Sequence, residues 1–179
     1  MIRDTRELRN CFGRYATGIA VVTLPAGPAH CGVTVNSFTS VSLEPPLVSF
    51  CLSRRSSLVP AFEAEERFAV NVLSASQADH SKRFAKPSLN SWGGVRFRED
   101  ALGCAVLDGA LASFSCRRFG LHEGGDHLII VGEVVEYDID RSAEPLVFYA
   151  GRYGAFLTDD PRTHALPNDA ASQFVSYWG

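Results

Sequence analysis

Hydroxyl and amide side chains are concentrated in one segment of the chain, where they are interleaved with apolar residues. The segment reads Thr34-Val35-Asn36-Ser37-Phe38-Thr39-Ser40-Val41-Ser42 and is followed by Glu44-Pro45-Pro46. At the irregular end of a strand, such side chains and nearby backbone N–H groups can hydrogen-bond a flat heterocycle and a phosphate without any charged residue. The same composition is typical of a surface strand with exposed hydroxyls, so both interpretations stay open on composition alone.

Two further segments combine cations with the boundary of a predicted helix. Ser53-Arg54-Arg55-Ser56-Ser57 lies where a strand gives way to a helix, a position at which backbone N–H groups favour an anion and arginines can bind phosphate. Lys82-Arg83-Phe84-Ala85 lies at the end of a later helix, where cations either interact with the helix dipole or reach a phosphate. An ordinary helix cap with solvated arginines is the alternative for the first segment.

A single histidine has a conspicuous setting. His127 follows the turn residues Gly124-Gly125-Asp126 and precedes the apolar run Leu128-Ile129-Ile130-Val131. This arrangement would place it at the rim of a β-barrel, where binding pockets commonly open. A packed or solvated histidine without a binding role is the alternative.

The common catalytic signatures are missing from the chain. It contains no GxSxG, HExxH, GxxxxGK[ST] or GxGxxG motif. Its five cysteines are odd in number and no two have CxxC spacing, which argues against a disulfide framework or a metal site and favours small buried hydrophobes. We therefore expect a bound small molecule to carry the chemistry.

Length and composition predict one folded domain. The chain has 179 residues, 46% hydrophobic and 21% charged, with a formal net charge of −3. This balance excludes a disordered chain and disfavours a duplex nucleic-acid partner. No apolar run approaches the roughly 18 residues needed to cross a membrane, and the first residues do not form a secretion signal. We expect a cytoplasmic protein without nucleic-acid or membrane partners.

The elements that must position these residues are mostly strands. Asp4 and Glu7 predict the start of a helix over residues 5–14, and two further short helices are expected, one after a cap at Ser56 or Ser57 and one from Ser76 to about Ala85. Strands are predicted over residues 19–24, 31–38, 46–52, 67–73, 111–119, 127–137, 145–149 and 153–157. Their mainly antiparallel connections favour a closed or nearly closed β-barrel with helices at its rim. We expect a domain over residues 1–157 and a tail over residues 158–179.

The segments together resemble a known family. Residues 32–48, reading GVTVNSFTSVSLEPPLV, are similar to the hallmark of the flavin reductase-like family, the small NAD(P)H:flavin oxidoreductases that serve two-component monooxygenases. The segments at 12–23, 68–73, 83–85, 125–127 and 132–134 follow in the family's order and at similar spacing. The resemblance covers residues 5–157, and it is the ordered set of motifs that makes it specific.

The resemblance implies a mainly β fold, the FMN-binding split β-barrel with a few short peripheral helices, usually present as a homodimer. It implies flavin contacts at Thr34, Asn36, Ser37, Phe38, Thr39 and Ser40 for the isoalloxazine and ribityl chain, and at Ser53, Ser56, Ser57, Lys82, Arg83 and Phe84 near the phosphate. His127 matches the position that meets the nicotinamide and is the implied catalytic residue, while Tyr153 matches a second NADH neighbour. Leu58 departs from the family, which often has a hydroxyl at that position, and the tail has no family counterpart.

The implied activity is hydride transfer from NADH to FAD or FMN, with reduced flavin diffusing to a partner oxygenase and no metal involved. Two alternatives remain open: a flavin-bound reductase of another acceptor, such as a quinone or an iron chelate, and a flavin-binding protein without turnover. FAD against FMN, NADH against NADPH and the identity of the oxygenase are also open. Phe174, Tyr177 and Trp178 in the tail suit either a dimer interface or an unattached segment.

Overall fold

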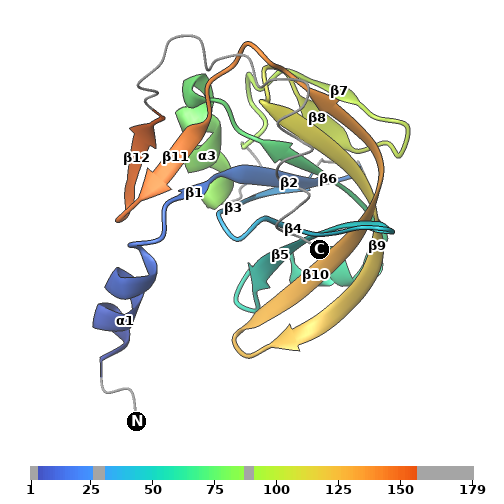
Figure 1. The fold of residues 1–179 in the computed structure, drawn as a ribbon. Helices are drawn as coiled ribbons and strands as arrows, with labels where there is room; N and C mark the ends of the chain where they lie inside the picture. The colour runs from blue at the N-terminus through green and yellow to red at the C-terminus, as the bar shows by residue number, and fades with distance from the viewer. Residues whose placement is uncertain (1–3, 26–30, 87–90, 157–179) are drawn as a thin grey trace.

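The computed structural model describes residues 4–25, 31–86 and 91–156, and within them the chain is built around one antiparallel sheet (Figure 1). Seven strands follow the order β3-β2-β6-β9-β10-β5-β4, and every pairing between them is antiparallel. The sheet curls on itself, so that β3 and β5 come to face each other. The predicted mainly β, barrel-like fold with short helices at its edge is confirmed.

The elements are, in chain order, α1 (Thr5–Phe12), β1 (Thr17–Gly18), β2 (Ala20–Leu24), β3 (Cys31–Val35), β4 (Thr39–Leu43), β5 (Pro46–Ser53), α2 (Val59–Ala64), β6 (Arg67–Val72), the 3-10 helix η1 (Ala75–Gln77), α3 (Ala78–Ala85), β7 (Phe97–Glu99), β8 (Ala105–Leu107), β9 (Ala112–Gly124), β10 (His127–Ile139), β11 (Leu146–Tyr149) and β12 (Arg152–Ala155). β11 and β12 form a small sheet with β1, and β7 pairs with β8.

A long hairpin forms the centre of the barrel. β9 and β10 are 13 residues each and join through Gly125, whose φ of 71° suits the tight turn. β10 also pairs with β5, with His127 opposite Ser53. The alternation of buried and half-buried residues in β5 and β10 reflects one face turned to the core.

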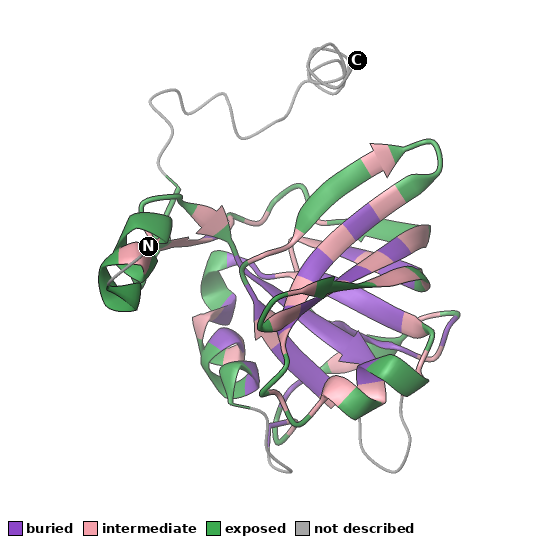
Figure 2. Cartoon of the chain, turned by 90° about the horizontal axis from the view of Figure 1, so that it is seen from below, coloured by how far each residue is buried: buried purple, intermediate pink, exposed green. Residues whose placement is uncertain are grey.

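Residues of the central strands are buried (Figure 2), and aromatic and branched side chains fill the barrel interior. Phe50 contacts Phe62 and Phe68 edge to face, with ring centroids 5.7 and 5.4 Å apart. A second cluster lies under α3, where Phe84 and Trp92 pack with centroids 4.9 Å apart. These two clusters stabilise the sheet and hold α3 against it.

One buried polar side chain joins three strands. Asn71 on β6 donates through Nδ2 to the carbonyls of Val21 and Ala105, at 3.2 Å each, and accepts the N–H of Leu107 at 2.8 Å. Thr23 donates to the same Ala105 carbonyl at 2.7 Å. The amide of this one side chain therefore links β6 to the backbones of β2 and β8.

The first helix stands apart from the barrel in two views (Figures 1 and 2). No residue of α1 is buried, and Phe12 and Tyr15 are 68% and 78% exposed. The connection after the helix touches the β11–β12 turn, where Ala150 N donates to Gly13 O at 2.8 Å and Arg14 donates to the Tyr149 hydroxyl at 3.0 Å. The predicted helix is confirmed over residues 5–12, but its apolar residues do not face the core.

Other expectations differ in detail from the structure. Ser74, not Ser76, starts the helical segment through a capping box with Gln77. The helix after Ser57 is capped by Leu58, whose apolar side chain makes no capping hydrogen bond, and Ser56 Oγ instead accepts the N–H of Leu58 at 3.2 Å. The strand predicted to reach residue 38 ends at residue 35, where the chain bends toward β4. The tail and its aromatics lie outside the described residues.

The cysteines only partly match the expectation of buried hydrophobes. Cys104 and Cys116 are buried, and burial raises the pKa of each thiol to about 12. Cys11 is exposed on α1, so the expectation is wrong there. Cys31 and Cys51 are intermediate.

Candidate functional site

A cleft opens where β3 and β5 face each other. Its volume is about 520 Å³, within the range of small-molecule sites. Ser37, just after β3, accepts the backbone N–H of Cys51 at 2.9 Å and donates to its carbonyl at 3.4 Å, so its hydroxyl bridges the two strands. The lining residues are Val33, Thr34, Val35, Asn36, Ser37, Cys51, Leu52, Ser53, Arg55, Ser56, Ser57, Ala85 and His127.

The β3 wall presents an amide to the cleft. Asn36 is exposed, while the Thr34 hydroxyl donates to the Ser81 carbonyl at 2.7 Å and so fastens β3 to α3. Polar groups from residues 34, 36 and 37 therefore line one side, as the sequence predicted for this segment. Of the three, the exposed Asn36 side chain is the one open to a ligand.

The opposite wall contains the turn from β5 to α2. Ser53 Oγ accepts the N–H of Arg55 at 3.3 Å, which keeps the turn compact. The Arg54 side chain pairs instead with Glu123 on β9, outside the cleft lining, whereas Arg55 lines the cleft. Of the two neighbouring arginines only Arg55 lines the cleft, together with Ser56 and Ser57.

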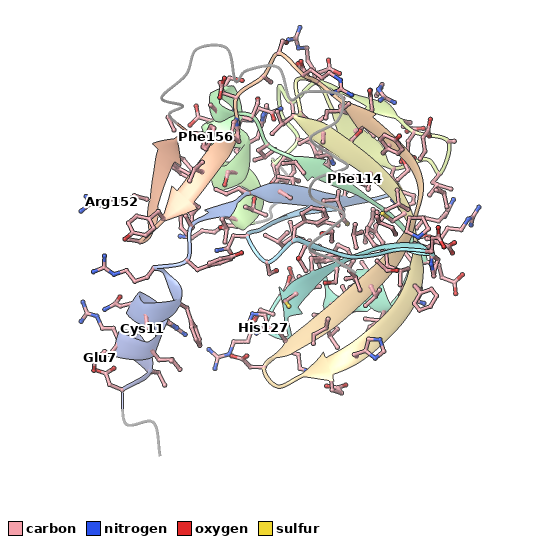
Figure 3. All side chains as sticks on the ribbon, in the orientation of Figure 1. Glu7, Cys11, Phe114, His127, Arg152 and Phe156 are labelled. Carbon is pink, nitrogen blue, oxygen red and sulfur yellow. The ribbon has the colours of Figure 1, made fainter. Side chains whose placement is uncertain are left out.

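His127 stands at the rim between these walls (Figure 3). Its Nδ1 lies 2.7 Å from Asp126 Oδ1, and this contact lowers the pKa of the Asp126 carboxyl. A carboxylate can only accept, so Nδ1 donates in this contact and Nε2 is the ring nitrogen left to meet a ligand. Arg54 N donates to Asp126 O at 3.0 Å, which ties the hairpin turn to the β5–α2 turn.

A smaller cavity of about 190 Å³ extends the cleft toward α3 and β12. It shares Thr34, Val35, Asn36 and Ala85 with the cleft and adds Tyr153. The Tyr153 hydroxyl lies 3.0 Å from Ser81 Oγ. The structure therefore brings Tyr153 to the same region as Asn36, as predicted.

Six predicted flavin contacts do not line the cleft: the buried Phe84 and five others. Thr39 and Ser40 are exposed on β4, Lys82 pairs with Asp79 at 3.0 Å, and Arg83 donates to the Gly93 carbonyl. Phe38 also points elsewhere: its ring stacks on Phe114, with centroids 5.6 Å apart.

Phe84 requires a correction, because its side chain is fully buried beneath Gly32 and Trp92 and cannot contact a ligand. A residue next to two cations in a helix can face the core, since neighbouring positions differ by about 100°.

The cleft and the smaller cavity also contain residues that the sequence analysis did not assign. Cys51 lies two positions before Ser53 on β5, and alternate residues of a strand share a face. Ser81 lies one helical turn before Ala85 on the same face of α3. Both could have been found by extending the predicted site along these periodicities. Within the described ranges, no group of His, Cys, Asp and Glu residues could hold a metal ion.

Comparison with known proteins places the site in context. Residues 12–157 match the model of the flavin reductase like domain. The chain is 42% identical to the FMN reductase (NADH) SmoA of Agrobacterium fabrum over 153 residues, 86% of this chain and 87% of the relative. It is 38% identical to the reductase subunit HsaB of a flavin-dependent monooxygenase from Mycobacterium tuberculosis, covering 84% of this chain and 81% of HsaB.

A solved structure agrees with these sequence matches. The NADH:FAD oxidoreductase SgcE6 of Streptomyces globisporus, in complex with NAD and FAD fragments, superposes with a TM-score of 0.83 at 36% identity. The match covers 89% of this chain and 98% of SgcE6. In the described part of the chain, none of the helices has the length and apolar character needed to cross a bilayer.

Proposed function

The chain belongs to the flavin reductase-like family, and from this premise we propose that the β3–β5 cleft binds the flavin to which NADH transfers a hydride. The protein is an NAD(P)H:flavin oxidoreductase of the kind that supplies reduced flavin to a monooxygenase. The observation that carries the site assignment is the convergence of Asn36, Arg55 and His127, from three separate segments, on one open cavity.

The residues of the cleft fit a flavin. The exposed Asn36 amide can hydrogen-bond the polar edge of the isoalloxazine, and Arg55 with the neighbouring serine hydroxyls can bind the ribityl phosphate. Lining apolar groups such as Val33 and Leu52 suit the ring faces. A flavin held by these residues would supply the hydride acceptor.

His127 and Tyr153 position the nicotinamide. With Nδ1–H donated to Asp126, the His127 Nε2 lone pair can accept the carboxamide N–H of NADH. Hydride transfer requires no proton from a side chain, so the protein contributes orientation and electrostatics. Tyr153, held by Ser81, borders the same region from β12.

The relatives guide the choice of cofactors and partner. SmoA is named an FMN reductase (NADH) and SgcE6 an NADH:FAD oxidoreductase, so we propose NADH as donor and either flavin as acceptor. HsaB is named the reductase subunit of a flavin-dependent monooxygenase, which supports delivery of reduced flavin to a separate oxygenase by diffusion. We also propose a cytoplasmic location and the division into a 1–157 domain and a 158–179 tail.

A homodimer would cover the exposed apolar surface of the chain. Phe12, Tyr15, Tyr137 and Phe156 are all more than half exposed, and aromatics are enriched at interfaces. Sedimentation equilibrium at micromolar concentration should report twice the monomer mass. A monomer would contradict the dimer, and a chain ending at Leu157 tests whether the tail contributes.

Steady-state NADH oxidation with free FMN or FAD tests the activity. A reductase consumes many equivalents of NADH per protein, whereas a flavin-storage protein is reduced once and stops. Activity that requires a quinone or an iron chelate in place of free flavin would support the reductase of another acceptor.

Flavin titration of two variants tests the site. Asn36→Ala and Arg55→Gln should each weaken flavin binding by roughly 0.5–1.5 kcal/mol, which corresponds to about twofold to twelvefold in the dissociation constant. Ser142→Ala removes a hydroxyl that bonds Asp140, outside the cleft lining, and is the matched control. Unchanged affinity in both variants would contradict the placement of the flavin.

Bound flavin should also slow alkylation of Cys51 on the cleft wall.

A further inference from the structure

Three residues connect β3 to β4, and their role in the cleft rests on the proposed function. They are Asn36-Ser37-Phe38, which follow Val35 at the end of β3 and precede Thr39 at the start of β4. In the described sheet β3 and β4 are the two terminal strands, and β3 is not a neighbour of β5. The cleft therefore opens where no backbone ladder joins β3 to β5, and this connection is the part of the chain that reaches across.

Ser37 extends the pairing of β4 with β5 by means of its side chain. Thr39 lies opposite Ser49 in that ladder, so the same register places Ser37 opposite Cys51. Every second residue of an antiparallel strand bonds the same neighbour, so the backbone groups of Cys51, like those of Ser49, face the β4 side. There the Ser37 hydroxyl replaces a backbone partner: its Oγ accepts the Cys51 N–H at 2.9 Å and lies 3.4 Å from the Cys51 carbonyl. One side chain thus fastens the β3–β4 connection to β5.

This contact leaves the Ser37 hydroxyl little capacity for a ligand. A hydroxyl has one proton and two lone pairs. The Cys51 N–H occupies one lone pair, and the proton is donated to the Cys51 carbonyl. Breaking the contact would leave a backbone N–H without its partner, which costs free energy. The oxygen and nitrogen acceptors at the edge of an isoalloxazine therefore need another donor, and the neighbouring Asn36 amide can supply it.

The chain is fixed on both sides of Asn36. Val35 precedes it and is buried at the end of β3, and Ser37 follows it on β5. Phe38 comes next and points inward, where its ring stacks on Phe114 with centroids 5.6 Å apart. Asn36 itself is exposed and lines the cleft. Its amide is therefore held in place before a ligand arrives, which reduces the conformational entropy lost on binding.

We infer that Ser37 is a positioning residue, whose hydroxyl fastens the β3–β4 connection to β5 and so holds the Asn36 amide where the flavin edge binds. Its effect on flavin affinity passes through Asn36 and requires no contact between the Ser37 hydroxyl and the flavin. The family resemblance implies a flavin contact at this position, whereas the geometry accounts for the hydroxyl by its bond to Cys51. That bond joins two groups of the protein, so it needs no ligand to form.

A double-mutant cycle on flavin affinity tests this inference. Ser37→Ala should raise the dissociation constant for FMN about threefold to tenfold, the range expected for loss of one hydrogen bond. In an Asn36→Ala background the same substitution should have less than about a 1.5-fold effect, because no amide remains to be held. Ser37→Thr keeps the hydroxyl and should bind FMN within about twofold of the wild type. Ser142→Ala is the matched control, because its hydroxyl bonds Asp140 outside the cleft lining. Effects of Ser37→Ala and Asn36→Ala that multiply would show direct flavin contact by Ser37 and overturn the inference.

Amide hydrogen exchange provides a readout that does not depend on flavin. In the full chain without added flavin, the Cys51 N–H should exchange at least about tenfold faster in Ser37→Ala than in the wild type or in Ser142→Ala, as followed by NMR. Equal exchange of this N–H in Ser37→Ala and the wild type would show that the bond does not fasten β5. Faster exchange spread evenly over the core strands would show general destabilisation. Either result overturns the inference.

The proposed function and this inference fail in different ways. If Asn36→Ala and Arg55→Gln both leave flavin affinity unchanged, the proposed flavin site is wrong and this inference fails with it. If Asn36→Ala weakens flavin binding while Ser37→Ala does not, the flavin site stands and only the positioning role of Ser37 is wrong.

Discussion

Gly132 in β10 is the residue at which one added methyl group should most disturb the barrel. A Cβ atom there would lie 2.2 Å from Phe68 Cζ, 2.9 Å from Phe68 Cε1 and 3.1 Å from Cys116 Cβ. Carbon atoms in contact are normally about 3.5–4.0 Å apart, so the Phe68 ring would have to move by more than an ångström. Phe68 is 1% exposed and packed edge to face on Phe50, which leaves it little room.

The cost of Gly132→Ala follows from this crowding. Overpacking a tight core costs about 1–3 kcal/mol, and the short contact with a fully buried ring argues for about 3 kcal/mol. For a domain of this size that corresponds to a fall in Tm of about 6–12 °C. Urea unfolding followed by fluorescence, together with a thermal melt, measures both quantities.

Two further variants make this prediction specific. Gly18→Ala is the matched control, because nothing lies within 4 Å of its added Cβ and its stability should change by less than about 0.5 kcal/mol. Phe68→Leu removes the crowding ring, so Gly132→Ala should cost less in that background than in the wild type. A Gly132→Ala protein as stable as the wild type, or equal costs in both backgrounds, would refute the reasoning.

Three other perturbations have outcomes that the structure predicts. Asn71→Asp places a buried carboxylate against two backbone carbonyls and should lower the free energy of unfolding at pH 7 by about 3–5 kcal/mol, measurable in urea. Iodoacetamide at pH 8.5 should label the exposed Cys11 within minutes. The buried Cys116 stays a neutral thiol at that pH because its pKa is about 12, so mass spectrometry should find Cys116 labelled only after unfolding. The same raised pKa lowers stability as the pH rises from about 9 toward 12, since only the unfolded thiol ionises there. Asp126→Ala should raise KM for NADH severalfold, because it frees the His127 ring. Asp126→Asn keeps an acceptor for Nδ1–H, so its KM for NADH should stay close to that of the wild type. Equal KM values in the two variants would show that the contact does not position the ring.

Much of the fold could be predicted because its signals are local. A strand was predicted over residues 127–137, and Gly124-Gly125-Asp126 marked the hairpin turn that β9 and β10 share. Asp4 caps α1 by accepting the N–H groups of Arg6 and Glu7, as its position before the helix suggested. These features depend on neighbours a few residues away, so the order of residues is enough to identify them.

The polar segments of the site were also recognisable from residue order and family resemblance. Asn36, Ser53 and His127 are far apart in the chain, and the resemblance, not their spacing, indicated that they meet. The structure places all three on one cleft. What residue order could not assign was the direction of each side chain within those segments.

That direction depends on which strands face each other in the curled sheet. Arg54 and Arg55 are equivalent in the sequence, yet one pairs with Glu123 across the hairpin and the other lines the cleft. Phe84 lies in a cationic segment but is buried against Trp92, and α1 has an apolar face without a core to cover. The sequence by itself determined eight of the strands, the hairpin and the polar segments, because these follow from local periodicity and turn chemistry, but it did not indicate β1, β4, β7 or β8. Only the tertiary structure decided which side chains share the cleft, because that depends on β3 and β5 coming together across the open side of the barrel.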